Sequence, residues 1–248
     1  MKMKRILSLI FFVLSFGLFG QEAQKELKIL FVGNSYTYGY NLAHITSIMA
    51  GETATHLDTY KSVLPGAKLS EHWEGKRGLE TRRIIAEGDF DLVILQAYSM
   101  AAIWNPEEAM KYIKLFSDHN REHGAHTMLF STWARERVPQ FQEEIDAMYM
   151  QAAVDNGILR APVGTAWELA MDLRPTVDLY TSDGSHPNEL GCMLSAAVFV
   201  ATICGELPKK MPTLFRIEDS RGETVRLMNH NPEDVEFCKR IAESVVLD

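Results

Sequence analysis

The sequence is poor in cysteine, with three among 248 residues. Their spacing matches no zinc or iron–sulfur pattern, and three thiols cannot all pair with one another. Cys192 and Cys204 fall on one predicted helix about 18 Å apart, which is too far for a disulfide. We therefore expect buried thiols, and a bridge from Cys238 to either of the others stays open in an oxidising compartment.

Positive charge is also scarce, because 25 lysines and arginines face 33 acidic residues and leave a formal net charge of -8. An acidic chain is a poor partner for nucleic acid or for an anionic membrane surface. We therefore expect no nucleic-acid partner.

Long hydrophobic runs are lacking too. The longest, residues 6–19, is shorter than the roughly 20 apolar residues of a spanning helix. Two lysines and an arginine precede it and Gly20 follows it, which is the pattern of a secretory signal. We expect cleavage near Gln21, export to the periplasm or beyond, and no integral membrane association of the mature chain. An uncleaved N-terminal anchor is the alternative, since Leu18 is not the small residue expected two places before Gly20.

What is present is an alternation of short apolar segments with stretches of helical period. Strands are expected at residues 27–32, 56–64, 91–96, 126–133 and 158–163. Helices are expected at residues 42–51, 78–87, 106–123, 138–155 and 188–204, and a terminal helix begins at Pro232 with Asn231 as its N-cap. This alternation predicts an α/β fold, a three-layer α/β/α sandwich around a parallel, flavodoxin-like five-stranded sheet.

The length that remains after the predicted signal suits one domain, residues 21–248. Its core is expected at about 27–207. A C-terminal extension, residues 208–248, contains a predicted turn at 220–222.

The carboxyl ends of parallel strands are where ligands bind in such sheets. Ser35 follows the first expected strand, and Gly66 follows the second. Residues 96–99 follow the third strand, and residues 133–135 follow the fourth. These segments are therefore expected to share one edge of the sheet.

A serine hydroxyl becomes a nucleophile when a base takes its proton and a third group orients that base. The segment YTSDGSHPNELG, residues 180–191, puts Asp183 three residues before His186, just ahead of a long predicted helix. A turn of this length can fold the Asp183 carboxylate onto Nδ1 of His186 and leave Nε2 for Ser35. The nucleophile-elbow pattern G-x-S-x-G is absent, because Thr37 occupies its final glycine position. Alternatively, Ser35 and its neighbours only cap the next helix.

The blocks VGNSYTYG and SDGSHPNELG resemble the first and last motifs of the SGNH or GDSL hydrolases. The resemblance implies a catalytic set of Ser35, Asp183 and His186, and oxyanion donors from the amides of Ser35 and Gly66. The third family block is missing, because DLVILQAYSM contains no G-x-N-D. The side chain of Gln96 is the candidate for that donor. No cofactor and no metal are expected.

The resemblance implies a secreted serine esterase, and we expect it to remove acetyl or other short acyl groups from a carbohydrate through an acyl-serine intermediate. The alternatives are a lipid-directed esterase or lysophospholipase, and a non-catalytic flavodoxin-like module that only binds a ligand. Aromatic residues at the expected site edge favour a sugar ester. The candidate substrate-binding residues are Tyr36, Tyr38, Trp73, Tyr98 and Trp133.

The pattern H-x-x-E-H at His119, Glu122 and His123 offers a rival, metal-dependent site. The helix that carries it leaves the carboxyl edge of the third strand and must end at the opposite edge, far from Ser35. Histidines also favour the carboxyl ends of helices, where they interact with the helix dipole. We therefore expect surface or capping residues rather than zinc ligands.

Overall fold

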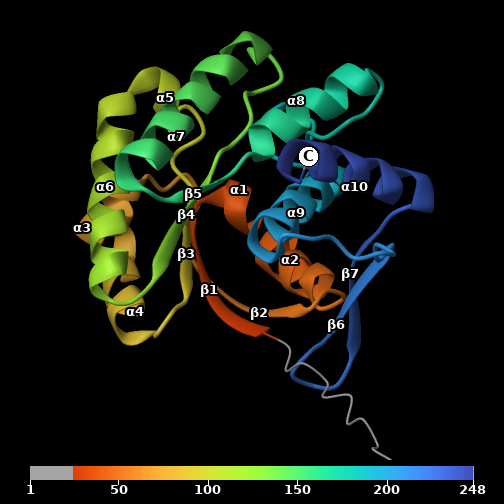
Figure 1. Cartoon of the computed structure of the whole chain (residues 1–248), viewed down its shortest axis with the longest axis horizontal. Coiled ribbons are helices and arrows are strands. Elements are labelled where there is room, and N and C mark those ends of the chain that lie inside the picture. The colour runs from red at the N-terminus through yellow and green to blue at the C-terminus, as the bar shows by residue number, and fades with distance from the viewer. Residues whose placement is uncertain (1–24, 248) are drawn as a thin grey trace, which may run out of the picture.

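Five parallel strands form the middle layer of the molecule in a computed structural model, which describes residues 25–247 (Figure 1). The strands are β1 Lys25–Gly33, β2 Thr55–Val63, β3 Leu92–Leu95, β4 His126–Phe130 and β5 Leu159–Ala161. Their order in the sheet is β2-β1-β3-β4-β5, the flavodoxin order. The predicted three-layer fold is therefore confirmed, whereas the predicted signal peptide, residues 1–20, lies outside the described residues.

Side-chain alternation along β1 explains why this strand occupies the centre of the sheet. Ile29 and Phe31 belong to the hydrophobic core on one face, and Leu30 and Val32 belong to the core on the other. All four side chains are fully buried. A strand that is apolar on both faces needs helices on both faces, which is the reason for the three layers.

The helices divide between the two faces of the sheet (Figure 1). One face is covered by α2 Leu42–Ala50, α8 Val163–Leu173, α9 Glu189–Cys204 and α10 Pro232–Val246. The other face is covered by α3 Leu69–Glu74, α4 Thr81–Glu87, α5 Ala101–Trp104, α6 Pro106–Glu122 and α7 Gln142–Asn156. The short helix α1 Ser35–Tyr38 continues from β1, and single 3-10 turns occur at Gly39–Asn41, Lys76–Gly78 and Pro139–Phe141.

The expected helices are all found, but α1, α3, α5 and α8 were not predicted. The helices α3 and α5 are too short to show a hydrophobic period. The helix α8 begins two residues after β5, where the apolar run of the strand hides its start. Conversely, β4 ends at Phe130 and not at Trp133, because the chain leaves the sheet there.

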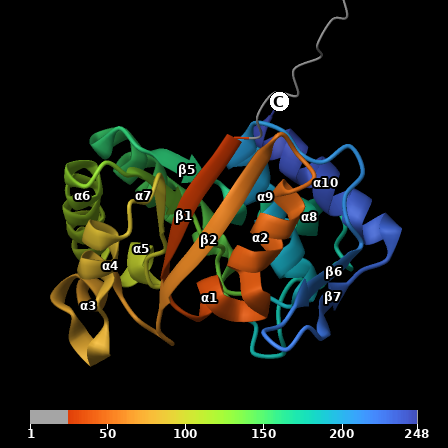
Figure 2. The same ribbon diagram turned by 90° about the horizontal axis from the view of Figure 1, so that it is seen from below.

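The C-terminal extension adds a hairpin and a helix to the α9 side of the sheet (Figure 2). The strands β6 Leu214–Glu218 and β7 Thr224–Asn229 flank the predicted turn. The N-cap prediction for α10 is confirmed, since Asn231 Oδ1 accepts a hydrogen bond from Asp234 N at 2.8 Å. Phe215 and Met228 of the hairpin join the same hydrophobic cluster as α9, so the extension completes a layer of the core.

The three cysteines carry free thiols. Cys192 and Cys238 are buried and Cys204 is partly buried. Burial raises the pKa of Cys238 to about 12 and raises that of Cys192 as well, so both stay protonated at neutral pH. In residues 25–247 no helix combines the length and the apolar character that crossing a bilayer requires.

Candidate active site

The end of β1 delivers Ser35 to the carboxyl edge of the sheet. Gly33 is the last residue of the strand, and a Cβ atom there would lie 2.4 Å from Thr37 Oγ1 and 2.6 Å from Gln96 Oε1. Only glycine therefore allows these side chains to pack against the strand end. Asn34 caps α1, since its Oδ1 accepts a hydrogen bond from Tyr36 N at 3.1 Å. Ser35 is consequently the first residue of α1.

The buried side chain of His72 forms a hydrogen bond to the last residue of β1. Nε2 of His72 donates to the Gly33 carbonyl at 2.9 Å, and its Nδ1 lies 2.7 Å from Thr81 Oγ1. Ser62 Oγ lies 2.8 Å from the same threonine oxygen. Burial lowers the pKa of His72, more than its bond to Gly33 and the charge of Glu71 raise it. The imidazole is therefore neutral, with Nδ1 as an acceptor.

His72 makes the stability of the fold depend on pH. In the unfolded chain its pKa returns to about 6.5, so the unfolded state binds the proton first as the pH falls. The unfolding free energy should therefore decrease from pH 7 towards pH 5. We expect His72→Gln to flatten this slope by up to about 1.4 kcal/mol per pH unit, measured by urea unfolding. His56→Gln, at an exposed position of β2, is the control. Equal slopes in wild type and His72→Gln would contradict a neutral buried imidazole.

Asn34 also fixes the turn that carries Gly66. Its Nδ2 donates to the Ala67 carbonyl at 3.1 Å, and Ala67 N donates to the Leu64 carbonyl at 3.0 Å. The turn has Pro65 in its second position and Gly66 in its third, where φ is +65°. A positive φ at the third position is typical of a type II turn and favours glycine. Asn34 thereby places Gly66 beside Ser35.

The loop between α8 and α9 positions the histidine. Asn188 caps α9, accepting a hydrogen bond from Gly191 N at 3.0 Å, and the Thr181 amide donates to the His186 carbonyl at 2.8 Å. Trp133, in the segment that follows β4, donates from Nε1 to the Ser185 carbonyl at 3.0 Å. The loop is thus tied at several points, so the imidazole has a defined orientation.

Ser35, His186 and Asp183 form a continuous chain of hydrogen bonds. Ser35 Oγ lies 2.8 Å from His186 Nε2, and His186 Nδ1 lies 2.5 Å from Asp183 Oδ2. Because an ionised carboxylate only accepts, Nδ1 carries the ring proton and donates a hydrogen bond to Asp183. Nε2 is then unprotonated and can accept the hydroxyl proton of Ser35.

The Asp183 carboxylate is ionised. Partial burial raises its pKa, but hydrogen bonds from the His186 side chain and amide, the Ser185 amide and the Thr181 hydroxyl outweigh this effect. The amides of Ser185 and His186 lie 2.8 and 2.9 Å from Asp183 Oδ1. The pKa is therefore held well below its ordinary value, and the negative charge that orients the imidazole persists throughout the neutral range.

A pocket of about 350 Å³ opens in front of Ser35. Among the described residues, neither the Ser35 nor the Gly66 amide has an intramolecular acceptor. These two N–H groups are therefore free to bind an oxyanion. The pocket is lined by Asn34, Ser35, Tyr36, Tyr38, Pro65, Gly66, Tyr98, Ser99, Arg135, Ser185 and His186.

Gln96 does not reach this pocket, which corrects the expectation of a side-chain oxyanion donor there. Its side chain is buried, and its Oε1 accepts from Asn34 N at 2.9 Å and from Thr37 Oγ1 at 3.0 Å. Its Nε2 donates to the Ala97 carbonyl. Both ends of the amide are therefore occupied, and Gln96 holds the segment that carries the nucleophile.

The five aromatic candidates divide into two groups. Tyr36, Tyr38 and Tyr98 line the pocket. Trp133 is only 1% exposed, because it stacks between Tyr36 and Trp167 with ring centres 4.7 and 3.8 Å away. It supports the site from inside the core, so the expectation of a substrate-binding tryptophan at this position is wrong.

Trp73 is also absent from the pocket lining, contrary to expectation. Its ring meets Phe116 edge-on at 5.1 Å and His119 at 5.8 Å, and the Arg82 guanidinium lies 5.0 Å from the ring centre. The tryptophan therefore fastens α3 to α6. Trp73 lies only a few residues after the turn that carries Gly66. The sequence there does not indicate that its side chain points away from the site.

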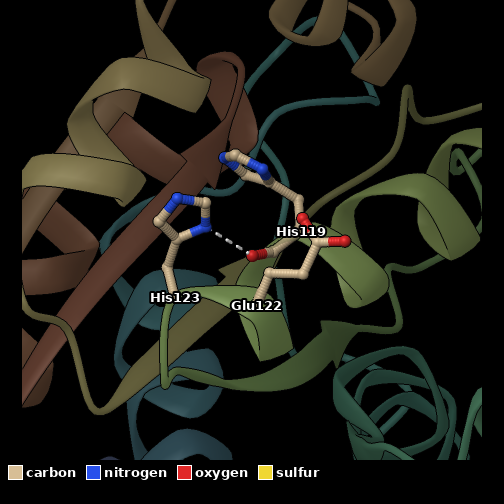
Figure 3. Close-up of side chains that lie close together, drawn as sticks. All are labelled: His119, Glu122 and His123. Carbon is tan, nitrogen blue, oxygen red and sulfur yellow. Dashed lines mark hydrogen bonds between the residues drawn. The ribbon is translucent and has the colours of Figure 1, made fainter.

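The rival cluster lies at the opposite edge of the sheet from Ser35. Figure 3 shows its three side chains close together. His123 caps α6 three residues before β4 begins, whereas Ser35 follows the end of β1. Ligand atoms of His119, Glu122 and His123 lie within 4.8 Å of one another. One ring nitrogen of each histidine donates to a backbone carbonyl, His123 Nδ1 to His119 at 2.9 Å and His119 Nε2 to Arg82 at 3.1 Å. The His123 bond caps the C-terminal end of α6, and the His119 bond joins α6 to α4.

Three residues of the site had no sequence pattern of their own. Arg135, Ser99 and Ser185 line the pocket beside Ser35. Ser99 follows the third strand, Arg135 follows the fourth strand, and Ser185 follows Asp183. The edge rule located the first two segments but not the side chains that face the pocket. His72, which supports Gly33, lies in a helix too short to be recognised from the sequence.

Comparison with solved structures places this arrangement among known folds. A DUF4886 family protein from Bacteroides uniformis superposes with a TM-score of 0.71 and 16% identity, over 90% of this chain and 95% of that one. A proposed SGNH hydrolase from Slackia heliotrinireducens superposes with a TM-score of 0.59 and 24% identity, over 72% of this chain and 100% of that one. The psychrotrophic esterase EstA from a Pseudoalteromonas species superposes with a TM-score of 0.56 and 12% identity, over 72% of this chain and 97% of that one.

No protein-family model and no curated protein matches the sequence. The similarity therefore rests on the arrangement of the elements, which is that of the SGNH hydrolases. The chain has their fold.

Proposed function

We propose that this protein is a serine ester hydrolase that removes acetyl or other short acyl groups from a carbohydrate. The observation that carries the proposal is the hydrogen-bond chain from Ser35 through His186 to Asp183. A chain of this kind makes a weak hydroxyl nucleophilic. The SGNH fold, which esterases and lipases share, supports it.

The reaction follows from the proton positions. Ser35 Oγ forms a bond to the ester carbonyl carbon while its proton passes to His186 Nε2, and Asp183 stabilises the imidazolium. The amides of Ser35 and Gly66 bind the oxyanion. The tetrahedral intermediate then expels the alcohol, which takes the proton from His186. Water attacks the acyl-serine by the same route, and the acid leaves as Ser35 is regenerated.

The proposal includes export. Export is proposed from the signal pattern of residues 1–20. An exported enzyme would meet its carbohydrate ester outside the cytoplasm. The tyrosines of the pocket, Tyr36, Tyr38 and Tyr98, offer apolar faces and hydroxyl groups of the kind that sugars contact.

An apolar cavity favours a second candidate, an esterase for lipid-like acyl groups. The cavity lies between α3, α5 and α6, and Tyr98 borders both it and the catalytic pocket. Its volume is about 170 Å³, whereas a cavity of roughly 150 Å³ encloses benzene. It can hold an apolar group of about six carbons but not a long acyl chain, so short acyl groups remain the better proposal.

Turnover on a panel of esters tests the proposal. We expect acetylated methyl glycosides and short-chain 4-nitrophenyl esters to be hydrolysed, and palmitoyl esters to be slower by about 10²-fold in kcat/KM. The Ser35→Ala protein gives the background rate of hydrolysis that does not depend on Ser35. A preference for palmitoyl esters would favour the lipid-directed candidate, and no hydrolysis of any ester would favour a binding module.

A further inference from the structure

Arg135 is a cation inside the catalytic pocket that the hydrolytic mechanism does not use. It follows β4 and lines the pocket together with Ser35 and His186. The protein is acidic overall, yet in the described part of the chain no carboxylate forms an ion pair with this guanidinium. Its charge is therefore available to a ligand.

Other partly buried arginines of this protein are neutralised. Arg160 pairs with Asp146 at 3.2 Å and Arg174 pairs with Asp234 at 2.5 Å. Removing a guanidinium from water is unfavourable unless acceptors or an anion replace the water. Arg135 lacks such an anion, and within residues 25–247 its buried Nε has no hydrogen-bond partner. A charge left in this condition at a binding site suits an anionic ligand.

The guanidinium of Arg135 is nevertheless held in place. Its Nη2 donates to Ser99 Oγ at 3.0 Å and to Tyr98 OH at 3.4 Å. Its carbon atom lies 5.7 Å from the centre of the Trp104 ring. Hydroxyls and an aromatic face orient the planar group without cancelling its charge, so little ordering is needed when an anion binds.

Strand order separates Arg135 from the oxyanion donors. Gly66 follows β2 and Arg135 follows β4, on opposite sides of Ser35 along the edge of the sheet. Neighbouring strands lie about 4.8 Å apart, so β4 lies roughly 10 Å from β1. This separation fits a substituent on the sugar better than the reacting carbonyl oxygen.

We propose that Arg135 binds a carboxylate on the carbohydrate, so that the substrate is an acylated acidic sugar. The inference rests on the proposed ester hydrolysis for its substrate. A guanidinium fork matches the planar carboxylate with two parallel hydrogen bonds. Trp104 is 63% exposed and borders the neighbouring cavity, so the part of its ring that the guanidinium leaves uncovered can pack against the sugar ring. One unpaired cation suits one negative charge, because the nearby Lys68 already faces Glu108 at 3.9 Å.

Two matched substrates test this inference. They are monoacetylated methyl glucopyranosiduronic acid and monoacetylated methyl glucopyranoside, which differ in a carboxylate and a hydroxymethyl group. We expect wild type to prefer the acid by about 10- to 100-fold in kcat/KM. Arg135→Gln should bring the ratio close to one, and Arg135→Lys should keep part of it. Arg137→Gln, an exposed neighbour outside the pocket, should leave the ratio unchanged.

A wild-type ratio near one overturns the inference. An unchanged ratio in Arg135→Gln also overturns it and makes Arg135 a general donor or a structural residue. A binding arm separates this failure from failure of the proposed function. Calorimetry with methyl glucopyranosiduronic acid compares the Ser35→Ala protein with Ser35→Ala/Arg135→Gln. If no ester is hydrolysed, binding of the acid that is lost in Ser35→Ala/Arg135→Gln still supports a carboxylate site at Arg135. Absence of binding to the Ser35→Ala protein overturns that site.

Discussion

Replacing Ser35 by alanine is expected to lower kcat for a short-chain ester by about 10⁵- to 10⁶-fold. Within residues 25–247 the hydroxyl is the only group hydrogen-bonded to His186 Nε2, at 2.8 Å, so its loss leaves the imidazole with no nucleophile to activate. The oxyanion donors would remain and would account for the residual rate. Covalent labelling by a fluorophosphonate should disappear in the same variant, and mass spectrometry of the labelled wild type should place the adduct on Ser35.

Ser182→Ala is the matched control for this variant. Ser182 belongs to the loop that carries Asp183 and His186, but its side chain is exposed and lies outside the pocket. It should therefore keep wild-type turnover and labelling. If Ser35→Ala retained more than about one per cent of the activity, the nucleophile would have to be sought elsewhere.

Asp183→Asn should reduce kcat by about 10⁴-fold while the fold persists. An asparagine oxygen can still accept the backbone amides of Ser185 and His186, but its NH₂ group would face His186 Nδ1. Nδ1 must then act as the acceptor, which moves the ring proton to Nε2. A protonated Nε2 cannot take the proton of Ser35, so the base is lost although every side chain stays in place.

Steady-state kinetics and thermal unfolding measured together separate this effect from loss of structure. A large fall in kcat with a similar melting temperature supports the tautomer argument. Asp178→Asn is a suitable control, because that residue lies near the same loop and outside the pocket. A fall in kcat of less than tenfold in Asp183→Asn would show that the carboxylate does not orient the catalytic imidazole.

The parallel sheet could be predicted because its middle strands β1, β3 and β4 are apolar over several successive residues. Buried β1, with Ile29 and Leu30 facing opposite layers, requires cover on both sides whatever the rest of the chain does. The long helices followed from their hydrophobic period. The short helices α3 and α5 could not be found this way, because a single turn shows no period and is stabilised by the contacts around it.

Individual side chains at the sheet edge were harder to predict. Gln96 and Trp133 stand where the edge rule puts site residues, yet both point into the protein. Gln96 turns inward because the amide of Asn34 needs an acceptor, and Trp133 because Tyr36 and Trp167 stack on its two faces. These partners come from other segments, so sequence near either residue carries no signal of them.

The sequence by itself determined the local parts of the proposed site: a strand that leads into Gly33, Asn34 and Ser35, and a loop in which Asp183 precedes His186 by three residues. Local order and periodicity encode such parts because they depend on near neighbours. Only the tertiary structure brought a serine and a histidine 151 residues apart within hydrogen-bond distance. It also decided that Arg135 lies in the pocket without a carboxylate, because the order of the strands, and not the order of the residues, sets which side chains are neighbours along that edge.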